Sequence, residues 1–103
     1  MQEIKAIIQP FMLHRVLDAL HGIEGLPGIV LSEAHAVSAE SGQYVQVVKT
    51  KMEIMVPDAL VEKVVQTIQK AAHTGRSGDG RIFVIPIEQT VNIRTGECSD
   101  GTQ

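Results

Sequence analysis

The apolar residues of this chain repeat with two different periods, and the order in which these periods follow one another restricts the folds that the chain can adopt. Apolar and polar residues alternate from residue 3 to residue 9, which is typical of a half-buried strand, and Pro10 ends this segment. Apolar residues then recur every three or four positions from Leu13 to Leu20, which predicts a helix with one buried face. The chain therefore has to pack helices against a sheet.

The next segments follow the strand pattern again. A second strand is predicted over 29–37, a short turn over 39–43 and a third strand over 44–56. In the third strand the apolar side chains stand mainly at even positions, so that Lys49 and its odd-numbered neighbours face the opposite side. These two strands should form a hairpin.

A second helix is expected to begin with Asp58 as its N-cap. Its buried stripe would consist of Val61, Val64, Val65, Ile68 and Ala72. A fourth strand is predicted over 81–85 and a last short strand over 91–94. The residues from Ser99 onward are polar, and we expect them to be mobile.

The resulting order is strand, helix, strand, strand, helix, strand, which indicates the α+β class and the ferredoxin-like βαββαβ fold with an antiparallel sheet. Residues 1–97 would form this domain, followed by a polar C-terminal tail at 98–103. Both helices should cover one face of the sheet. The other face would expose apolar side chains, namely Ile7, Val45, Val47 and Met55. Because an exposed apolar face usually marks an interface, we expect a closed symmetric assembly.

Composition excludes several classes of protein. A chain of 103 residues is enough for one domain. The net charge of −3 and the pI of about 5.7 argue against nucleic acid as the main partner. No apolar run approaches the roughly 18 residues that would insert into a membrane. The single cysteine, Cys98, excludes an internal disulfide and fits a reducing, cytoplasmic location.

The segment Thr74–Phe83 places three glycines and two arginines between the second helix and the fourth strand. Glycine lets main-chain N–H groups approach a ligand closely, and successive N–H groups in a turn form an anion-binding concavity. Arginine adds a donor fork that suits phosphate, and Asp79 can stiffen the turn by bonding local backbone. The alternative is a plain surface loop in which Gly75 merely ends the helix. The residues alone leave both interpretations open.

Four segments of the chain resemble the PII signalling proteins. These are Ile4–Phe11, which resembles the first strand of that family, Lys51–Asp58, which resembles its third strand, Thr74–Phe83, which resembles its phosphate-binding loop, and Ile93–Glu97, which resembles its C-terminal signature. The resemblance covers nearly the whole chain.

This resemblance implies a compact homotrimer whose sheets face inward and whose adenine-nucleotide sites lie in clefts between subunits, where ATP and ADP compete. It implies a regulator that is not an enzyme. Such a protein senses ligands and then contacts a transporter, a metabolic enzyme or another regulator.

The site residues implied by the resemblance are carried over by position. The phosphate-binding segment comprises Thr74, Gly75, Arg76, Gly78, Asp79 and Gly80, and the main-chain N–H groups of the last four would hold the phosphates. Arg81, where the family usually has lysine, would pair with phosphate oxygens, and Arg94 would reach them from a neighbouring subunit. The adenine pocket would be lined by Ile7, Val30 and Met55. Mg²⁺ remains an option alongside ATP.

The chain also departs from the family pattern. Asn92 stands where the family usually has a second arginine, which leaves the phosphate clamp one charge poorer and favours ADP or AMP over ATP. The T-loop between the second and third strands is shortened, so an ammonium channel is not the expected target. Lys49 matches the lysine that pairs with 2-oxoglutarate, but Ala36–Ser38 stand where its partners would be. Lys49 alone makes a weak site, and we do not expect 2-oxoglutarate to bind.

A second hypothesis is a trimer that responds to metals or small anions, similar to the CutA divalent-ion tolerance proteins or to relatives linked with heavy-metal efflux or with bicarbonate and carboxysomes. The histidines lack the tight spacing of a metal site; they are His14, His21, His35 and His73. Cys98 stands alone in a polar tail. We therefore assign no metal ligand and no catalytic residue.

Overall fold

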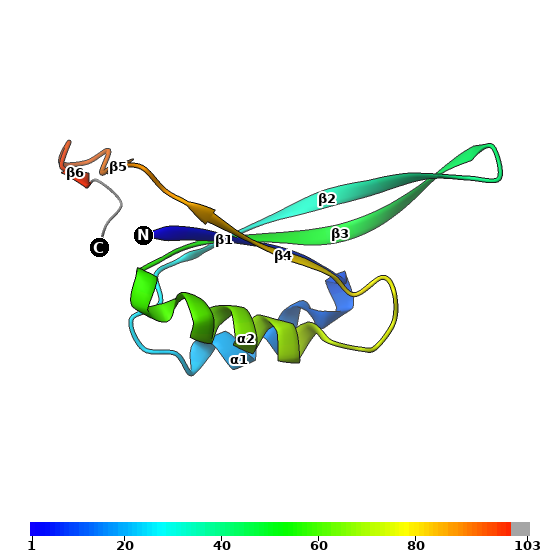
Figure 1. Ribbon diagram of the computed structural model, residues 1–103, viewed down its shortest axis with the longest axis horizontal. Coiled ribbons are helices and arrows are strands. Elements are labelled where there is room, and N and C mark those ends of the chain that lie inside the picture. Colours follow the sequence, from blue (N-terminus) through cyan, green and yellow to red (C-terminus); the bar gives the residue numbers. More distant parts are fainter. Residues whose placement is uncertain (100–103) are drawn as a thin grey trace.

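The computed structural model describes residues 1–99, in which two α-helices cover one face of a four-stranded antiparallel sheet (Figure 1). The sheet has the strand order β2-β3-β1-β4. The elements in chain order are β1 (Gln2–Ile8), the 3-10 helix η1 (Pro10–Met12), α1 (Leu13–His21), β2 (Ile29–Glu40), β3 (Gln43–Val56), the 3-10 helix η2 (Asp58–Leu60), α2 (Val61–Ala72), β4 (Gly80–Pro86), β5 (Thr90–Val91) and β6 (Cys98–Ser99). The predicted α+β fold of the ferredoxin-like type is confirmed.

The core lies between the sheet and the helices. Every second side chain of β1, and of the part of β3 that pairs with it, points toward the helices. Helices α1 and α2 meet these side chains with their apolar stripes. The largest fully buried side chains are Ile4, Ile8, Val16, Leu20, Met52, Ile54, Val56, Val64 and Ile68. No polar or charged side chain is buried within residues 1–99, so burial of aliphatic surface holds the two layers together.

The register of β1 against β3 assigns the remaining side chains to the open face of the sheet. Ile4 pairs with Ile54 on the helix side, and Lys5 pairs with Glu53 on the open side. Ile7 and Met55 share the open side, as predicted from the alternation. Val45 and Val47 point to the same side of β3 as Met55, but they lie in the part of β3 that precedes its pairing with β1.

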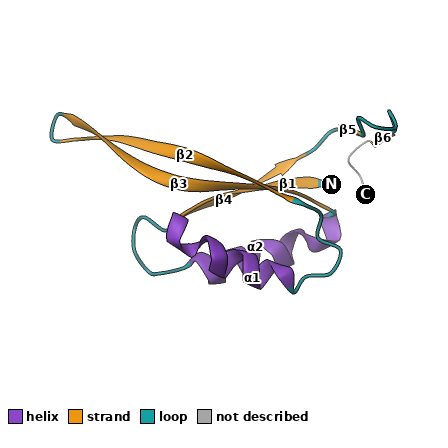
Figure 2. Cartoon of the chain, turned by 180° about the vertical axis from the view of Figure 1, so that it is seen from behind, coloured by secondary structure: helices purple, strands orange, loops and turns teal. Residues whose placement is uncertain are grey.

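Strands β2 and β3 extend past the rest of the sheet as a two-stranded arm, defined here as residues 34–49 (Figures 1 and 2). β1 covers β3 only as far as the pair Ile8–Thr50, whereas β2 and β3 stay paired to Glu40–Gln43. The turn of the arm consists of Ser41 and Gly42, whose φ angles are 50° and 79°. Positive φ at both positions is what a type I′ hairpin turn requires. The predicted turn over 39–43 was therefore too wide, and β2 runs beyond the predicted end at residue 37.

Asp58 does not cap the second helix. Pro57 precedes the 3-10 turn η2, which is closed by a hydrogen bond from the Leu60 N–H to the Pro57 carbonyl at 2.9 Å. The carboxylate of Asp58 instead accepts a hydrogen bond from the N-terminal ammonium group of Met1 at 2.7 Å. The predicted N-cap was wrong because the 3-10 turn satisfies the backbone before α2 begins at Val61.

The predicted strand over 91–94 is also wrong. Only Thr90–Val91 is extended, and it pairs with Cys98–Ser99 to form a small hairpin. Residues 92–97 form the turn of this hairpin. The first two residues of the predicted tail are thus paired, and residues 100–103 lie outside the described residues.

Replacing Ile68 with alanine tests the position of the core. Ile68 is 0% exposed, so we expect Ile68→Ala to lower the free energy of unfolding by about 2–5 kcal/mol. Ile93→Ala removes the same atoms from a side chain that is 99% exposed and should change it by less than about 0.5 kcal/mol. Urea unfolding measures both values, and similar losses for the two variants would contradict this placement of the core.

Candidate anion-binding groove

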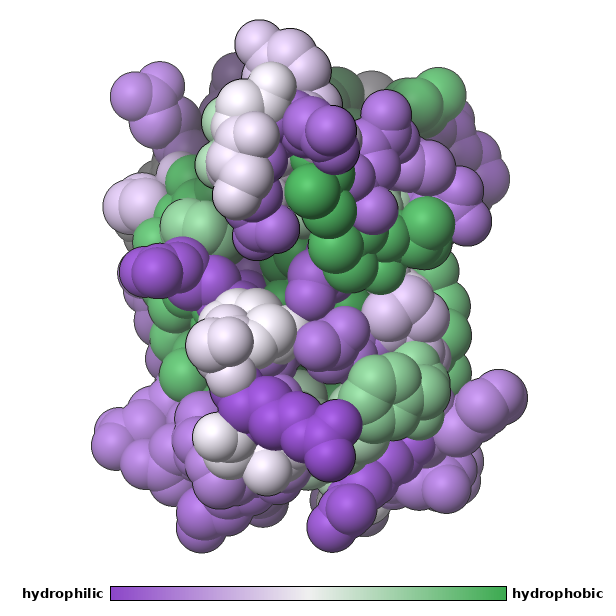
Figure 3. All heavy atoms as spheres, turned by 90° about the vertical axis from the view of Figure 1, so that its right-hand side faces the viewer, coloured by the Kyte–Doolittle hydropathy of each residue, from purple (hydrophilic) through white to green (hydrophobic). Residues whose placement is uncertain are grey.

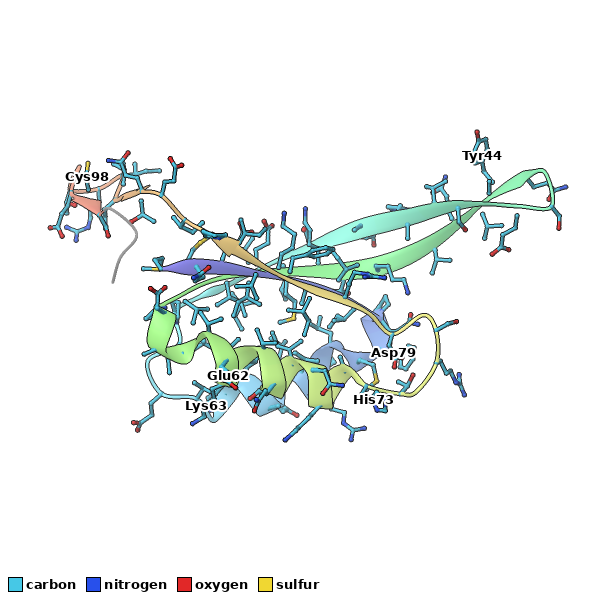
Figure 4. All side chains as sticks on the ribbon, in the orientation of Figure 1. Tyr44, Glu62, Lys63, His73, Asp79 and Cys98 are labelled. Carbon is cyan, nitrogen blue, oxygen red and sulfur yellow. The ribbon has the colours of Figure 1, made fainter. Side chains whose placement is uncertain are left out.

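The loop between α2 and β4, residues 73–79, is folded around the carboxylate of Asp79. This carboxylate accepts hydrogen bonds from the N–H groups of Thr74 at 2.8 Å and Gly75 at 2.9 Å, and from the Thr74 hydroxyl group. The N–H of Asp79 donates to the carbonyl of Arg76 at 3.2 Å. The prediction that Asp79 bonds local backbone is confirmed. Figure 4 shows Asp79 beside the end of α2, near His73.

These contacts lower the pKa of Asp79 below the ordinary aspartate value. The largest cause is the hydrogen bond from the Thr74 hydroxyl, followed by the bond from the Thr74 N–H. Both stabilise the ionised carboxylate. Asp79 therefore stays charged and keeps its hydrogen bonds at every pH above that of ordinary aspartate titration.

Glycines permit the close approaches that shape this loop. Gly80 has a φ of 112°, and a Cβ atom there would lie 1.8 Å from the carbonyl oxygen of Ile7. A Cβ atom at Gly78 would lie 2.7 Å from Nε2 of Gln9. Only glycine fits where β4 leaves the loop and joins β1.

A groove of about 430 Å³ lies on the open face of the sheet beside this loop. It is lined by Ile7, Lys49, Ser77, Gly78, Gly80, Arg81 and Phe83. The lining contains two cationic side chains and no carboxylate. Nζ of Lys49 donates a hydrogen bond to the Gly78 carbonyl at 2.7 Å, although the two residues are far apart in the sequence. The groove thus has the charge and the donors that bind an anion.

Lys49 is the residue whose position sequence reasoning described least well. The sequence suggested that Lys49 would pair with the carboxylate of 2-oxoglutarate, but without the other residues of such a site. In the structure Lys49 is hydrogen-bonded to the glycine loop. The pairing of β3 with β1 stops at Thr50, so Lys49 is the first arm residue beyond β1. Ser77 and Phe83 line the groove and were not singled out either; only their places inside the glycine-rich segment could have indicated them.

The proposed phosphate donors of the loop are already partly engaged. The Arg76 N–H donates to the Thr74 hydroxyl oxygen at 3.3 Å, and the Asp79 N–H donates to Arg76. An anion that used these two donors would have to replace bonds within the loop.

The structure brings only one of the expected adenine-pocket residues to the groove. Ile7 pairs with Arg81 across β1 and β4 and lines the groove. Met55 lies four residues along β3 from the partner of Ile7, a separation of about 13 Å. Val30 stands on β2, where it is 61% exposed. Within one protomer these residues share the open face but do not surround one pocket.

Arg94 lies at the opposite end of β4 from the glycine loop, in the turn of the small β5–β6 hairpin (Figure 1). It cannot meet Arg81 within one protomer.

A second cavity of about 380 Å³ lies on the helix side of β4. Its wall is largely apolar and includes Ile8, Val65, Ile68, Ala72 and Ile82. Asp79 and Arg81 both line it, so this cavity, unlike the groove, includes a carboxylate. The groove on the open face is therefore the better anion site.

Residues 1–99 contain neither a cluster of metal-ligating side chains nor a helix that could span a membrane. Within this part of the chain, no group of three or more histidine, cysteine, aspartate and glutamate side chains is placed to hold a metal ion. No helix among these residues is long and apolar enough to cross a membrane.

A family model, curated proteins and a solved structure that are similar to this chain all carry the name P-II or PII. The family model "Nitrogen regulatory protein P-II" matches residues 1–97. Over 107 aligned residues the chain is 46% identical to a nitrogen regulatory protein P-II of Azospirillum brasilense and 47% identical to one of Rhodospirillum rubrum, covering 94% of this chain and 95% of each relative. The crystal structure of Arabidopsis thaliana PII bound to citrate matches with a TM-score of 0.80 and 35% identity, covering 99% of this chain and 91% of that chain.

Gly80→Ala tests the close approach of β4 to β1. We expect the free energy of unfolding to fall by at least about 2 kcal/mol, for two reasons. The new Cβ atom would collide with the Ile7 carbonyl, and alanine is strained at this positive φ. Gly42→Ala is the matched control, since Gly42 also has positive φ but nothing lies within 4 Å of its Cβ position; it should cost about 1 kcal/mol. Equal losses would show that backbone strain alone explains the glycine.

The lowered pKa of Asp79 predicts how the loop responds to pH. A carboxylate with a depressed pKa in the folded state contributes its stabilisation above the unfolded value, about 3.9, and loses it as pH falls through the lower folded value. We therefore expect the Thr74 and Gly75 N–H groups to remain protected from hydrogen exchange down to about pH 4 and to lose protection below it. In Asp79→Asn this pH dependence should disappear; its persistence would assign the effect to another group.

Proposed function

Because the chain belongs to the nitrogen regulatory protein P-II family, we propose that it is a signal-transduction regulator that binds an adenine nucleotide and then contacts a transporter or a metabolic enzyme. The observation that carries the nucleotide part of this proposal is the groove on the open face. It joins the glycine loop to two cations, Lys49 and Arg81, with no carboxylate in its lining.

The phosphates of the nucleotide would lie in this groove. Arg81 would pair with phosphate oxygens, and Lys49 would exchange the Gly78 carbonyl for a phosphate oxygen. The N–H groups of the loop would supply further donors. The Arabidopsis relative was crystallised with citrate, which is itself a multiply charged anion. ADP, ATP with or without Mg²⁺, and AMP are the candidate ligands.

The site would be completed by a neighbouring copy in a homotrimer. Within one protomer, Arg94 lies far from the groove, and Val30 and Met55 stand on the open face away from it. A copy packed against the open face would bury these apolar side chains and could place its own Arg94 beside the phosphates. An inter-subunit site accounts for residues that one chain leaves separated.

The arm is the surface that we propose contacts the regulated protein. Tyr44 stands beside the turn of the arm (Figure 4) and is 84% exposed. Val37, Val47 and Val48 are also exposed along the arm. Viewed from the end that carries the arm and the glycine loop, apolar side chains show between hydrophilic ones (Figure 3). Exposed aromatic and aliphatic side chains of this kind are common in protein interfaces. We also propose that the target is a protein other than an ammonium channel, because the arm ends in a turn of only two residues.

Binding of a nucleotide would affect the arm through Lys49. This residue begins the part of β3 that β1 no longer covers, and it is hydrogen-bonded to the loop that would hold the phosphates. A ligand that takes over this ammonium group changes what holds the base of the arm. The groove could also accept a small anion such as bicarbonate, which is the second candidate that the same two cations favour.

Calorimetric titration of the protein with ADP, ATP and AMP, each with and without Mg²⁺, tests the proposal. Loss of a hydrogen bond to a charged group costs about 1.5–3 kcal/mol, so Arg81→Ala and Arg94→Ala should each weaken binding about tenfold or more. Arg15→Ala, which removes an exposed arginine from α1, should leave affinity unchanged. Absence of binding by any nucleotide would refute the proposal, and binding of bicarbonate or phosphate alone would favour the small-anion alternative.

A further inference from the structure

Asn92 makes hydrogen bonds with four of the five residues that follow it in the turn that carries Arg94. Its side-chain oxygen Oδ1 accepts hydrogen bonds from the N–H groups of Arg94 at 3.0 Å and Thr95 at 3.2 Å. Its main-chain N–H donates to the Glu97 carbonyl at 2.9 Å, and its carbonyl accepts from Gly96 at 2.7 Å. One residue therefore closes both the hairpin and the turn within it.

Packing does not hold this turn in place. Ile93, which precedes Arg94, is 99% exposed, and the strands β5 and β6 that flank the turn have two residues each. No residue of the turn belongs to the buried core. Hydrogen bonds within the turn must therefore fix the direction in which Arg94 leaves the backbone.

The hydrogen bonds to the N–H groups of Arg94 and Thr95 require a short side chain that carries an acceptor oxygen. The N–H groups of residues 94 and 95 need an oxygen from a side chain two or three residues earlier, and asparagine provides one at that spacing. An arginine side chain carries only donors and could not replace it. Compared with an arginine at position 92, asparagine thus removes a positive charge from the turn but orders its backbone.

We propose that Asn92 is a positioning residue that holds the Arg94 turn in its binding geometry before the ligand arrives. This inference rests on the proposed role of Arg94 toward phosphate. A group that is already ordered loses less conformational entropy on binding, so the ordered turn offsets part of the attraction that a second arginine would add. Asn92 acts through Arg94 and need not touch the nucleotide.

A double-mutant cycle on the full chain, titrated with ADP, tests this role. We expect Asn92→Ala to weaken ADP binding about fivefold, in line with the loss of a side-chain cap. In the Arg94→Ala background the same change should have no further effect, because the residue through which Asn92 acts is gone. Asn92→Ser differs from Asn92→Ala by one hydroxyl oxygen and should recover part of the affinity, since serine makes the same turn more weakly.

Hydrogen exchange of the Arg94 and Thr95 N–H groups, followed by NMR, gives a readout that needs no ligand. Protection should fall in Asn92→Ala and partly return in Asn92→Ser, while the thermal midpoint stays unchanged because the turn lies outside the core.

The outcomes separate this inference from the proposed function. Failure of the wild-type protein to bind any nucleotide refutes the proposed function, whatever Asn92 does. Tight binding of ADP by the wild type and equally by Asn92→Ala, or equal losses from Asn92→Ala with and without Arg94, would refute the positioning role. Unchanged protection of the two N–H groups in Asn92→Ala would refute it as well.

Discussion

The length of β1 determines where both the arm and the groove lie. β1 is the central strand that pairs with β3 on one side and β4 on the other, and it stops at Ile8. Pro10 then begins a 3-10 turn, so the backbone leaves the sheet. β3 and the chain before β4 continue past this point without β1 between them. One continues as the arm and the other as the glycine loop, and the groove lies where they adjoin.

The hydrogen bond from Lys49 to Gly78 spans the place where β1 has ended. Without β1 there, a side chain rather than a strand connects β3 to the chain that leads into β4. An ammonium group that bonds a carbonyl on the edge of an open groove is exposed to competition from any anion that enters. Asp79 behaves differently, because its carboxylate faces the N–H groups of Thr74 and Gly75 and keeps the loop closed. The negative charge thus supports the loop from within, while the positive charges face the groove.

Sequence patterns predicted the layers of the fold well, because each strand and helix carries its own periodicity. The alternation of Ile4, Ala6 and Ile8 was sufficient to assign the buried face of β1. The sequence was less informative wherever hydrogen bonds outside regular elements decide the structure. Asp58 satisfied the pattern of an N-cap, yet a 3-10 turn and the N-terminal ammonium group took precedence. The contact between Lys49 and Gly78 depends on the register of three strands, and no local pattern specifies that register.

Asn92 shows why a departure from a family pattern has to be read in three dimensions. In the sequence it is simply a missing arginine, and charge counting leads to a weaker clamp. In the structure its oxygen orders the two N–H groups that follow, which an arginine could not do. The site that we propose would therefore draw on three parts that lie outside the core: the glycine loop, the base of the arm and the β5–β6 turn of a neighbouring copy. Hydrogen bonds within the loop and within the turn order these two parts, and the pairing of β2 with β3 holds the base of the arm. In the function that we propose, a ligand that bridges these parts would change the position of one relative to another at little cost in core packing, which would let the protein change its contacts when the ligand binds.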